Sequence, residues 1–174
     1  MKPWMMFTKH LEGYDLDQIM AGLHRAGVDG ADLCVRPGYP VNPDNAAIEL
    51  PKAARRFEEN SLCIPLVTTP GDFVEADGEA ECLFSACGDA GVKFLKLGYW
   101  FMEEDGYWAS IDRCRRRLEA FASIAEKTGV KALVHNHSGG SLGLNSSSVM
   151  NLVKGFDPAS VSYTHLTLPT IYSV

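Results

Sequence analysis

Two histidines on either side of one asparagine form the most suggestive polar group in the sequence. His135, Asn136 and His137 follow a short apolar run and precede a serine and two glycines. In an extended segment, side chains two residues apart point the same way, so the two imidazoles face one space. Imidazole nitrogens bind metals and hydrogen bond to hydroxyl groups. The pattern therefore favours a divalent metal or a polyol ligand; the alternative is a pair of strand-end residues bonded to backbone carbonyls.

Five further polar side chains occupy equivalent places, directly after other short apolar runs. They are Lys9, Arg36, Thr68, Lys96 and Tyr99. In parallel α/β folds, ligands bind outside the carboxyl ends of the strands. We therefore expect these side chains to line the same site as the histidine pair.

The elements that must position these residues are short strands that alternate with helices. Apolar runs cover about residues 4–7, 31–35, 62–68, 94–97 and 132–135. Helical patterns cover about 15–27, 51–59, 83–90, 110–128 and 146–156. Asp15 and Gln18 have the spacing of a capping box, and Gly129 is placed as a C-cap. This alternation predicts βα units and a parallel sheet buried on both faces.

The spacing of the strands favours one kind of parallel sheet. The apolar runs begin about 32 residues apart on average, so eight units would need about 250 residues, as in a (β/α)8 barrel. A doubly wound sheet is the other candidate. We expect an α/β fold, an incomplete TIM barrel with about five of its eight units in these 174 residues. Its two open sheet edges predict marginal stability or aggregation of the isolated chain.

The composition limits which binding partners and which cellular compartment are expected. The formal net charge is −6, and no dense block of Lys and Arg offsets it, so nucleic acid is not an expected partner. No apolar run approaches the length of a membrane span or of a signal-peptide core. The five cysteines contain no C-x-x-C pair and are expected to be reduced core thiols. We expect a cytoplasmic protein that does not bind a membrane.

The last residues differ in composition from the rest of the chain. Residues 162–174 contain no Lys, Arg, Asp, Glu or Gly, and they look like an in-frame translation of a sequencing-library adaptor. We therefore expect a partial barrel over residues 1–161 and a non-native tail over 162–174. The alternative is a genuine β-rich end of the chain.

Three surface patterns have ordinary structural explanations. The acidic group 103–105 is expected to be solvated, and so are the arginines among residues 113–117, with Arg115 paired to Glu119. Aromatic residues on both sides of the acidic group could form a wall or lid for a sugar ring or pack at a subunit contact. The sequence has no G-x-G-x-x-G and no P-loop, so dinucleotide binding and nucleotide hydrolysis lose their usual support.

The strand ends together resemble those of the xylose isomerase-like TIM-barrel family, also called sugar phosphate isomerases/epimerases. The supporting stretches are residues 6–9, 32–38, 64–69, 95–99 and 135–139. The resemblance covers about residues 4–161. It depends on the order of the five stretches along the chain more than on any single stretch. It implies a sugar or polyol partner, a divalent ion (manganese, magnesium, cobalt or zinc) and proton transfer between adjacent carbons.

The resemblance also implies roles for individual residues. His135 stands where many members have a metal-binding Glu, and His137 stands at the neighbouring substrate-side His. His137 and Lys96 would be catalytic. The residues implied for substrate binding are Lys9, Arg36, Thr68, Tyr99 and Asn136. The remaining metal ligands of the family follow later strands, so we expect this chain alone to be inactive. A homo-oligomer is a possible state of the full-length protein.

Two other functions stay open at this stage. A barrel without its metal carboxylates could bind sugars or a partner without catalysis. An apurinic-site endonuclease would use the same barrel, but that resemblance implies histidines where this chain has Arg36, Thr68 and Thr69.

Overall fold

The computed structural model describes residues 3–164 and contains one parallel sheet of six strands. The strands are β1 (Met5–Phe7), β2 (Gly30–Cys34), β3 (Cys63–Thr68), β4 (Phe94–Lys96), β5 (Lys131–His135) and β6 (Val161–Thr164). They lie in chain order, and every neighbouring pair is parallel. The predicted α/β architecture is confirmed, with one more strand than the five predicted units.

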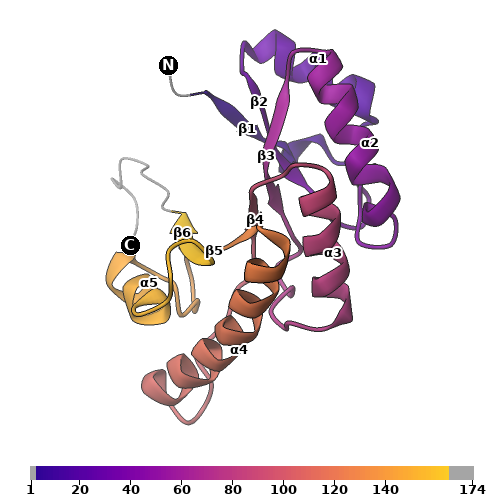
Figure 1. Ribbon diagram of the computed structural model, residues 1–174. Helices are drawn as coiled ribbons and strands as arrows, with labels where there is room; N and C mark the ends of the chain where they lie inside the picture. Colours follow the sequence, from indigo (N-terminus) through magenta and orange to yellow (C-terminus); the bar gives the residue numbers. More distant parts are fainter. Residues whose placement is uncertain (1–2, 165–174) are drawn as a thin grey trace.

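Helices connect consecutive strands and lie along one side of the sheet in chain order (Figure 1). They are the 3-10 helix η1 (Thr8–Leu11) and the α-helices α1 (Leu16–Ala26), α2 (Ala46–Glu59), α3 (Gly78–Asp89), α4 (Tyr107–Thr128) and α5 (Ser146–Val153). From α2 onward, each α-helix packs against the next one. This repeated strand-then-helix arrangement places the carboxyl ends of all strands at one edge of the sheet.

Local signals fix the ends of two helices where the sequence predicts them. The Asp15 side chain accepts from the Gln18 backbone N–H, and the Gln18 side chain accepts from the Asp15 N–H, which is a complete capping box. Gly27 and Gly129 end α1 and α4 with φ of 66° and 68°, a conformation that glycine adopts at no steric cost.

Other boundaries differ from the predicted ones. α2 begins at Ala46 rather than Pro51, because the Asn45 carbonyl already accepts from the N–H groups of Ile48 and Glu49. Pro51 therefore lies inside the helix. α5 is capped by Asn145, whose side chain accepts from the Ser148 N–H. The boundary predicted at residue 161 falls within β6, and residues 165–174 lie outside the described part of the chain.

The two faces of the sheet have different side chains. Ala31, Leu33, Val67, Leu95 and Val134 point toward the helices and are buried. The opposite face carries polar and aromatic residues in register, such as Thr68 beside Lys96. The Lys96 ammonium lies 4.4 Å from the Phe7 ring centroid although two strands separate β1 from β4. The sheet is therefore strongly curved, and this second face is its concave side.

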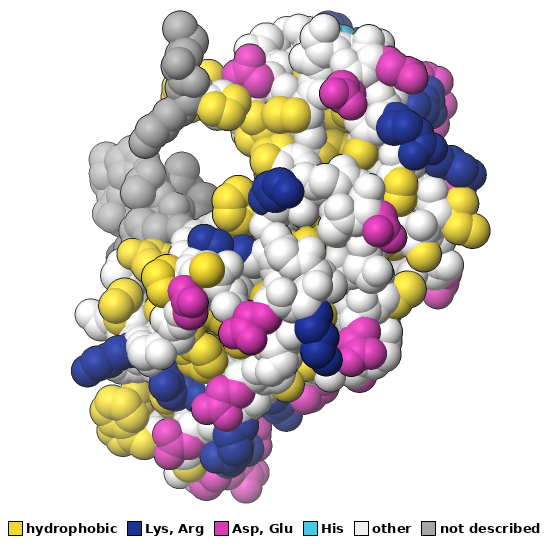
Figure 2. All heavy atoms as spheres, in the orientation of Figure 1, with side chains coloured by type: hydrophobic (Ala, Val, Ile, Leu, Met, Phe, Trp, Pro, Cys, Tyr) yellow, Lys and Arg dark blue, Asp and Glu magenta, His cyan; other side chains and the backbone are white. Residues whose placement is uncertain are grey.

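The surface charges, the hydropathy of the helices and the cysteines do not indicate a specific function. Figure 2 shows acidic and basic side chains interspersed over the face in view. Between residues 3 and 164 no helix is both long enough and apolar enough to cross a bilayer. All five cysteines are free, and three of them are buried; Cys63 and Cys82 are exposed, so the prediction that all five are core thiols is wrong. Both lie at positions whose side chains point away from the helix-covered core.

Candidate functional site

A buried polar network occupies the concave face where β2, β3 and β4 end. Lys96 Nζ lies 3.0 Å from Asp32 Oδ2, and both side chains are largely buried. The Thr68 hydroxyl donates to Asp32 Oδ1. Thr8 Oγ1 accepts from the Cys34 N–H at 2.9 Å. The structure thus brings Thr68 and Lys96 together around a carboxylate that the sequence-based site did not include.

Asp32 escaped the prediction because it lies within an apolar strand rather than after one. It follows Ala31 and precedes Leu33, and its partner Lys96 is 64 residues away. A buried carboxylate is stable only when its oxygens have hydrogen-bond or charge partners. The signal in the sequence that could have identified Asp32 as a site residue is the presence of an acidic residue in the middle of a buried strand.

Arg36 and Thr69 connect the ends of the same strands. Arg36 Nε donates to the Thr69 carbonyl at 2.8 Å, and Thr69 Oγ1 donates to the Lys96 carbonyl at 2.8 Å. The Arg36 side chain is half-buried. Its guanidinium is therefore held at the carboxyl edge of β2 by the loop that follows β3.

Tyr99 and the two histidines form a second group beside this network. The Tyr99 ring centroid lies 4.1 Å from that of His137 and 6.3 Å from that of His135. His135 Nδ1 lies 2.6 Å from Thr164 Oγ1 on β6. His137 is exposed, and its Nδ1 lies 3.0 Å from the Ser138 carbonyl, which can only accept. Nδ1 of His137 is therefore the donor in this contact.

A glycine contact fixes the position of Tyr99. Gly98 N donates to the Phe73 carbonyl and Tyr99 N donates to the Gly71 carbonyl, both at 2.8 Å. A Cβ atom at Gly98 would lie 2.4 Å from the Gly71 oxygen. Only glycine lets the loops after β3 and β4 approach this closely, and that approach aims Tyr99 at the histidines.

The remaining predicted residues lie at the rim. Among residues 3–164, the Lys9 ammonium has no ion pair or hydrogen bond, although the Lys9 carbonyl accepts from the Tyr39 hydroxyl at 2.6 Å. Asn136 is half-buried, and its N–H donates to the Thr164 carbonyl at 3.5 Å. Among the described residues, the Lys9 ammonium therefore takes no part in the interactions above.

Electrostatic effects connect the two groups. Burial raises the pKa of the Tyr99 hydroxyl; the Arg36 charge lowers it, and Asp32 and Cys34 raise it further. Burial also raises the pKa of Cys34, against the opposing charge of Arg36. Burial raises the pKa of Tyr39 to about 12. The positive charge of Arg36 lowers the pKa of all three groups, against the larger effect of burial.

The surface predictions for α4 need correction. Arg113 pairs with Glu103 at 3.1 Å and with Asp105, so these groups are not merely solvated. Arg115 Nη1 donates to the carbonyls of Leu152 and Lys154 at 2.9 and 2.8 Å, instead of pairing with Glu119. The carbonyls at the end of α5 need donors, and a guanidinium satisfies several at once.

The aromatic wall is only partly available to a ligand. Trp100 is buried, and its Nε1–H donates to the Val74 carbonyl at 3.2 Å. Phe101 and Trp108 are exposed at the rim. Tyr99 is the member of this group that faces the histidines.

Residues 139–143 have the Gly-x-Ser-x-Gly spacing of a serine-hydrolase nucleophile, but not its geometry. Such a serine sits on a sharp turn directly between a strand and a helix. Here β5 ends at His135, Ser141 comes six residues later, and α5 begins only at Ser146. Ser141 is buried, and its Oγ accepts from the Gly143 N–H at 3.1 Å. Ser141 is therefore a loop-stabilising residue.

The described residues do not form a metal site by themselves. No three His, Cys, Asp or Glu side chains between residues 3 and 164 are placed to hold one ion. Asp32 accepts from Lys96 and Thr68, and His135 contacts Thr164. These residues by themselves do not fit a resident metal.

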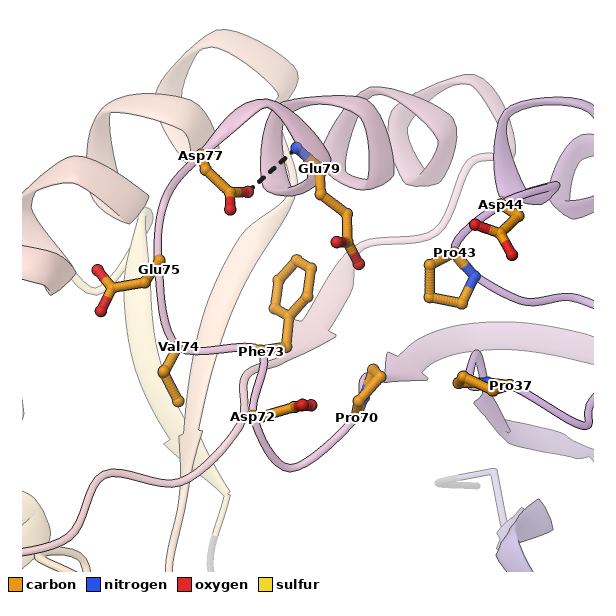
Figure 3. Close-up of a pocket in the computed structure, with 10 residues that line it drawn as sticks. All are labelled: Pro37, Pro43, Asp44, Pro70, Asp72, Phe73, Val74, Glu75, Asp77 and Glu79. Carbon is orange, nitrogen blue, oxygen red and sulfur yellow. Dashed lines mark hydrogen bonds between the residues drawn. The ribbon is translucent and has the colours of Figure 1, made fainter.

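A pocket of about 380 Å³ lies beside the site, between the loops that follow β2 and β3 (Figure 3). Carboxylates and apolar groups line it; they include Asp44, Asp72, Glu79, Phe73 and three prolines. Asp77 also lines it but caps α3, and Glu75 pairs with Arg117 at 2.7 Å. None of the predicted site residues lines this pocket.

Comparisons with known proteins agree with this fold. No protein-family model matches the chain, and no curated protein sequence does. Solved structures match with TM-scores of 0.67 for a D-tagatose 3-epimerase-like protein and 0.71 for an L-ribulose 3-epimerase. A third match is a xylose isomerase-like TIM-barrel protein from Mycobacterium smegmatis in complex with magnesium, at 0.67.

These likenesses show the fold of the chain, which is that of a TIM barrel. Sequence identities to the three structures are 17, 13 and 12%. The matches cover 94, 95 and 92% of this chain, but only 64, 60 and 63% of the other chains. The chain thus spans under two-thirds of their length and has the fold of an incomplete barrel, as predicted.

Proposed function

We propose that residues 1–161, which include strands β1–β5, are part of a sugar isomerase or epimerase. The observation that carries the proposal is the convergence of Lys96, Arg36, Tyr99 and His137 at the carboxyl ends of parallel strands. Ligands bind at this edge in TIM barrels. Two of the three structural neighbours reported above support the same class, because one is named an L-ribulose 3-epimerase and the other a D-tagatose 3-epimerase-like protein.

The reaction would move a proton between adjacent carbons of an open-chain sugar. Such a step needs a base beside the carbon and donors beside its oxygens. His137 is suited to accept the proton at Nε2, because its Nδ1–H is directed at the Ser138 carbonyl. The Tyr99 ring beside it offers an apolar face for the sugar carbons.

The other proposed roles follow from position. Lys96, held by Asp32, would place a positive charge near a developing oxyanion. Thr68, Asn136 and Lys9 would contact hydroxyl groups. His135 would be one ligand of a divalent ion if further ligands came from chain beyond the described residues. We also propose that residues 1–161 are part of a longer barrel and that residues 162–174 are not native.

The first experiment is to sequence the gene across the codon for Val161 and beyond. The barrel length predicts a reading frame that continues for about 90–100 residues. The extended protein, assayed with ketoses in D2O with each of the four metals, should exchange carbon-bound hydrogen for deuterium and form the aldose isomer, which is the product of proton transfer between adjacent carbons.

Two variants make this assay specific. His137→Ala should abolish exchange, whereas His24→Ala, which removes an exposed histidine on α1, should not change it. An extended protein that binds sugars but shows no exchange with any metal would instead be a non-catalytic sugar-binding barrel. The absence of a three-ligand set among residues 3–164 is the observation that favours this second function.

A further inference from the structure

The pocket in Figure 3 has apolar walls on two sides. One wall is the Phe73 ring, which also packs against the Phe121 ring of α4 with the centroids 6.1 Å apart. Pro43 and Pro37, from the loop after β2, form the facing wall, and Pro70 lies between the two. None of the residues that line the pocket is a lysine, an arginine or a histidine. The pocket is therefore an apolar space with no positive charge in its lining.

Hydrogen bonds hold both walls of the pocket in place. The Phe73 N–H donates to the Pro70 carbonyl at 3.3 Å, and the Phe73 carbonyl accepts from the Gly98 N–H at 2.8 Å. On the other side, the Asn42 N–H donates to the Asn45 side chain at 2.9 Å, which closes the turn that carries the facing wall. A pocket whose shape is fixed before binding loses less conformational entropy when a ligand enters.

Three carboxylates in the lining of the pocket have no partner in the described part of the chain. Asp44, Asp72 and Glu79 form no ion pair and accept no hydrogen bond between residues 3 and 164. The other two acidic residues of the lining are occupied, because Asp77 accepts from backbone N–H groups of α3 and Glu75 pairs with an arginine of α4. The unpaired charges around this apolar space are therefore all negative.

An organic cation matches this combination of surfaces better than a metal ion does. Figure 3 shows the Glu79 carboxylate between the Phe73 ring and Pro43, so negative charge and apolar surface face the same space. A hard metal ion prefers oxygen ligands on all sides, and no three His, Cys, Asp or Glu side chains between residues 3 and 164 are placed to hold one. An ammonium group pairs with carboxylates, and its carbon substituent packs on apolar walls. We propose that this pocket binds a small protonated amine with an apolar body.

This amine site is separate from the candidate sugar site and does not rest on the proposed function. None of the residues assigned to the sugar lines the pocket, although Pro37 and Pro70 directly follow Arg36 and Thr69 in the chain. The volume of about 380 Å³ is within the range of pockets that bind small molecules. All of the lining residues lie between positions 37 and 79, so the 174-residue chain can be tested directly.

The test compares four ligands by NMR titration of the chain, which measures the affinity and shows where each ligand binds. Benzylamine has a charge and an apolar body, benzyl alcohol has the body alone, methylamine has the charge with almost no body, and Mg²⁺ is an inorganic cation. Benzylamine should bind about tenfold or more tightly than each of the others, because a charge-assisted hydrogen bond and apolar burial act together. Its affinity should fall as salt screens the charges.

Four variants assign the binding to the pocket. Glu79→Gln and Asp72→Asn each remove one exposed charge and should weaken benzylamine binding about threefold or more, without weakening that of benzyl alcohol. Pro43→Ala removes part of one wall and should weaken benzylamine but not methylamine. Glu81→Gln, at an exposed glutamate of α3 outside the pocket lining, is the matched control and should change neither. Circular dichroism of each variant checks that the fold is retained, and the wild-type ligand comparison does not depend on any variant.

The outcomes separate an amine site from simpler explanations. Equal affinity for benzylamine and benzyl alcohol would indicate an apolar crevice, and equal affinity for benzylamine and methylamine or Mg²⁺ would indicate a general negative surface; either result overturns the inference. Chemical-shift changes away from the pocket, or affinity unchanged in both Glu79→Gln and Asp72→Asn, also overturn it. None of these results affects the isomerase proposal, and an extended protein without proton exchange would leave the amine site in place.

Discussion

The network at β2–β4 and the histidine group at β5–β6 differ in how their side chains are held. Lys96 and Asp32 are buried and paired with each other, and Thr68 completes the carboxylate's contacts. His137 is exposed and contacts a neighbouring carbonyl and the Tyr99 ring. The difference follows from position along the strands, because Asp32 and Lys96 lie within β2 and β4, whereas His137 lies two residues beyond the end of β5.

This contrast indicates that one region stabilises the fold and that the other is available to bind a ligand. Polar groups with internal partners contribute to the stability of the strand ends, and exposed groups are available for a ligand. Substitutions at β2–β4 should therefore lower the free energy of unfolding, whereas substitutions at the histidines should change ligand affinity instead.

Lys96→Met should give the largest loss of stability. The substitution leaves the Asp32 carboxylate buried with only Thr68 as its side-chain partner. Removal of one member of a buried ion pair costs about 3–5 kcal/mol. Urea unfolding measures the change, and Lys93→Met, at an exposed lysine just before β4, is the matched control.

A second substitution tests the cause of that loss. Asp32→Asn combined with Lys96→Met removes both charges and should recover much of the stability, because no charge is then left unpaired. If the double variant were as unstable as Lys96→Met alone, the loss would come from packing rather than from the isolated carboxylate.

Gly98→Ala should have the next largest effect and should affect both regions. The added Cβ would lie 2.4 Å from the Gly71 carbonyl oxygen, so the loops after β3 and β4 must separate. Overpacking of this kind costs about 1–3 kcal/mol, and Tyr99 would move with its loop. Gly78→Ala is the control, because a Cβ there meets nothing within 4 Å. Comparable urea midpoints for the two variants would contradict this account.

Tyr39→Phe should change the pH dependence of stability by a smaller amount. The pKa of Tyr39 is raised from 10.0 to about 12, mainly by burial. The folded chain therefore holds this proton more tightly than the unfolded chain, so its contribution is present below pH 10.0 and is lost as pH rises through about 12. Tyr39→Phe should show a shallower decline of unfolding free energy above pH 10.0, measured by urea unfolding.

The two proteins share every other titrating group in that experiment. Burial raises the pKa of Cys87 to about 12 as well, but this contribution cancels in the difference between wild type and variant. The lost bond to the Lys9 carbonyl lowers stability by about 1 kcal/mol wherever Tyr39 of the wild type is protonated. Parallel pH profiles would show that Tyr39 does not titrate differently in the folded state.

The parts of the fold with local signals were predictable from the sequence. Asp15, Gln18, Gly27 and Gly129 mark helix ends through groups within a few residues, and the structure confirms them. The start of α2 was not predictable in this way, because Asn45 makes no side-chain cap and Pro51 resembles a first helical residue. The element types followed from the alternation of apolar runs, which reflects burial rather than local caps.

The candidate site was predictable only where its residues follow strands. Arg36, Thr68, Lys96 and Tyr99 could be placed at one edge, because parallel strands end together. Asp32 could not be selected, since its role depends on Lys96, far away in the chain. Arg115 illustrates the same limit, because its spacing indicated Glu119 but the α5 carbonyls provided more acceptors.

His137→Ala should produce the smallest change in stability and so sharpen the contrast between the two regions. The side chain is exposed, and exposed substitutions usually change the unfolding free energy by less than about 0.5 kcal/mol. Its ring lies 4.1 Å from Tyr99, and the pair forms the face on which a sugar would stack, so sugar affinity should fall several-fold. Urea unfolding and calorimetry on one preparation measure both quantities, with His24→Ala as the control. A loss of stability above 1 kcal/mol with unchanged affinity would make the histidine group part of the framework, and the division between framework and ligand-facing residues would then be wrong.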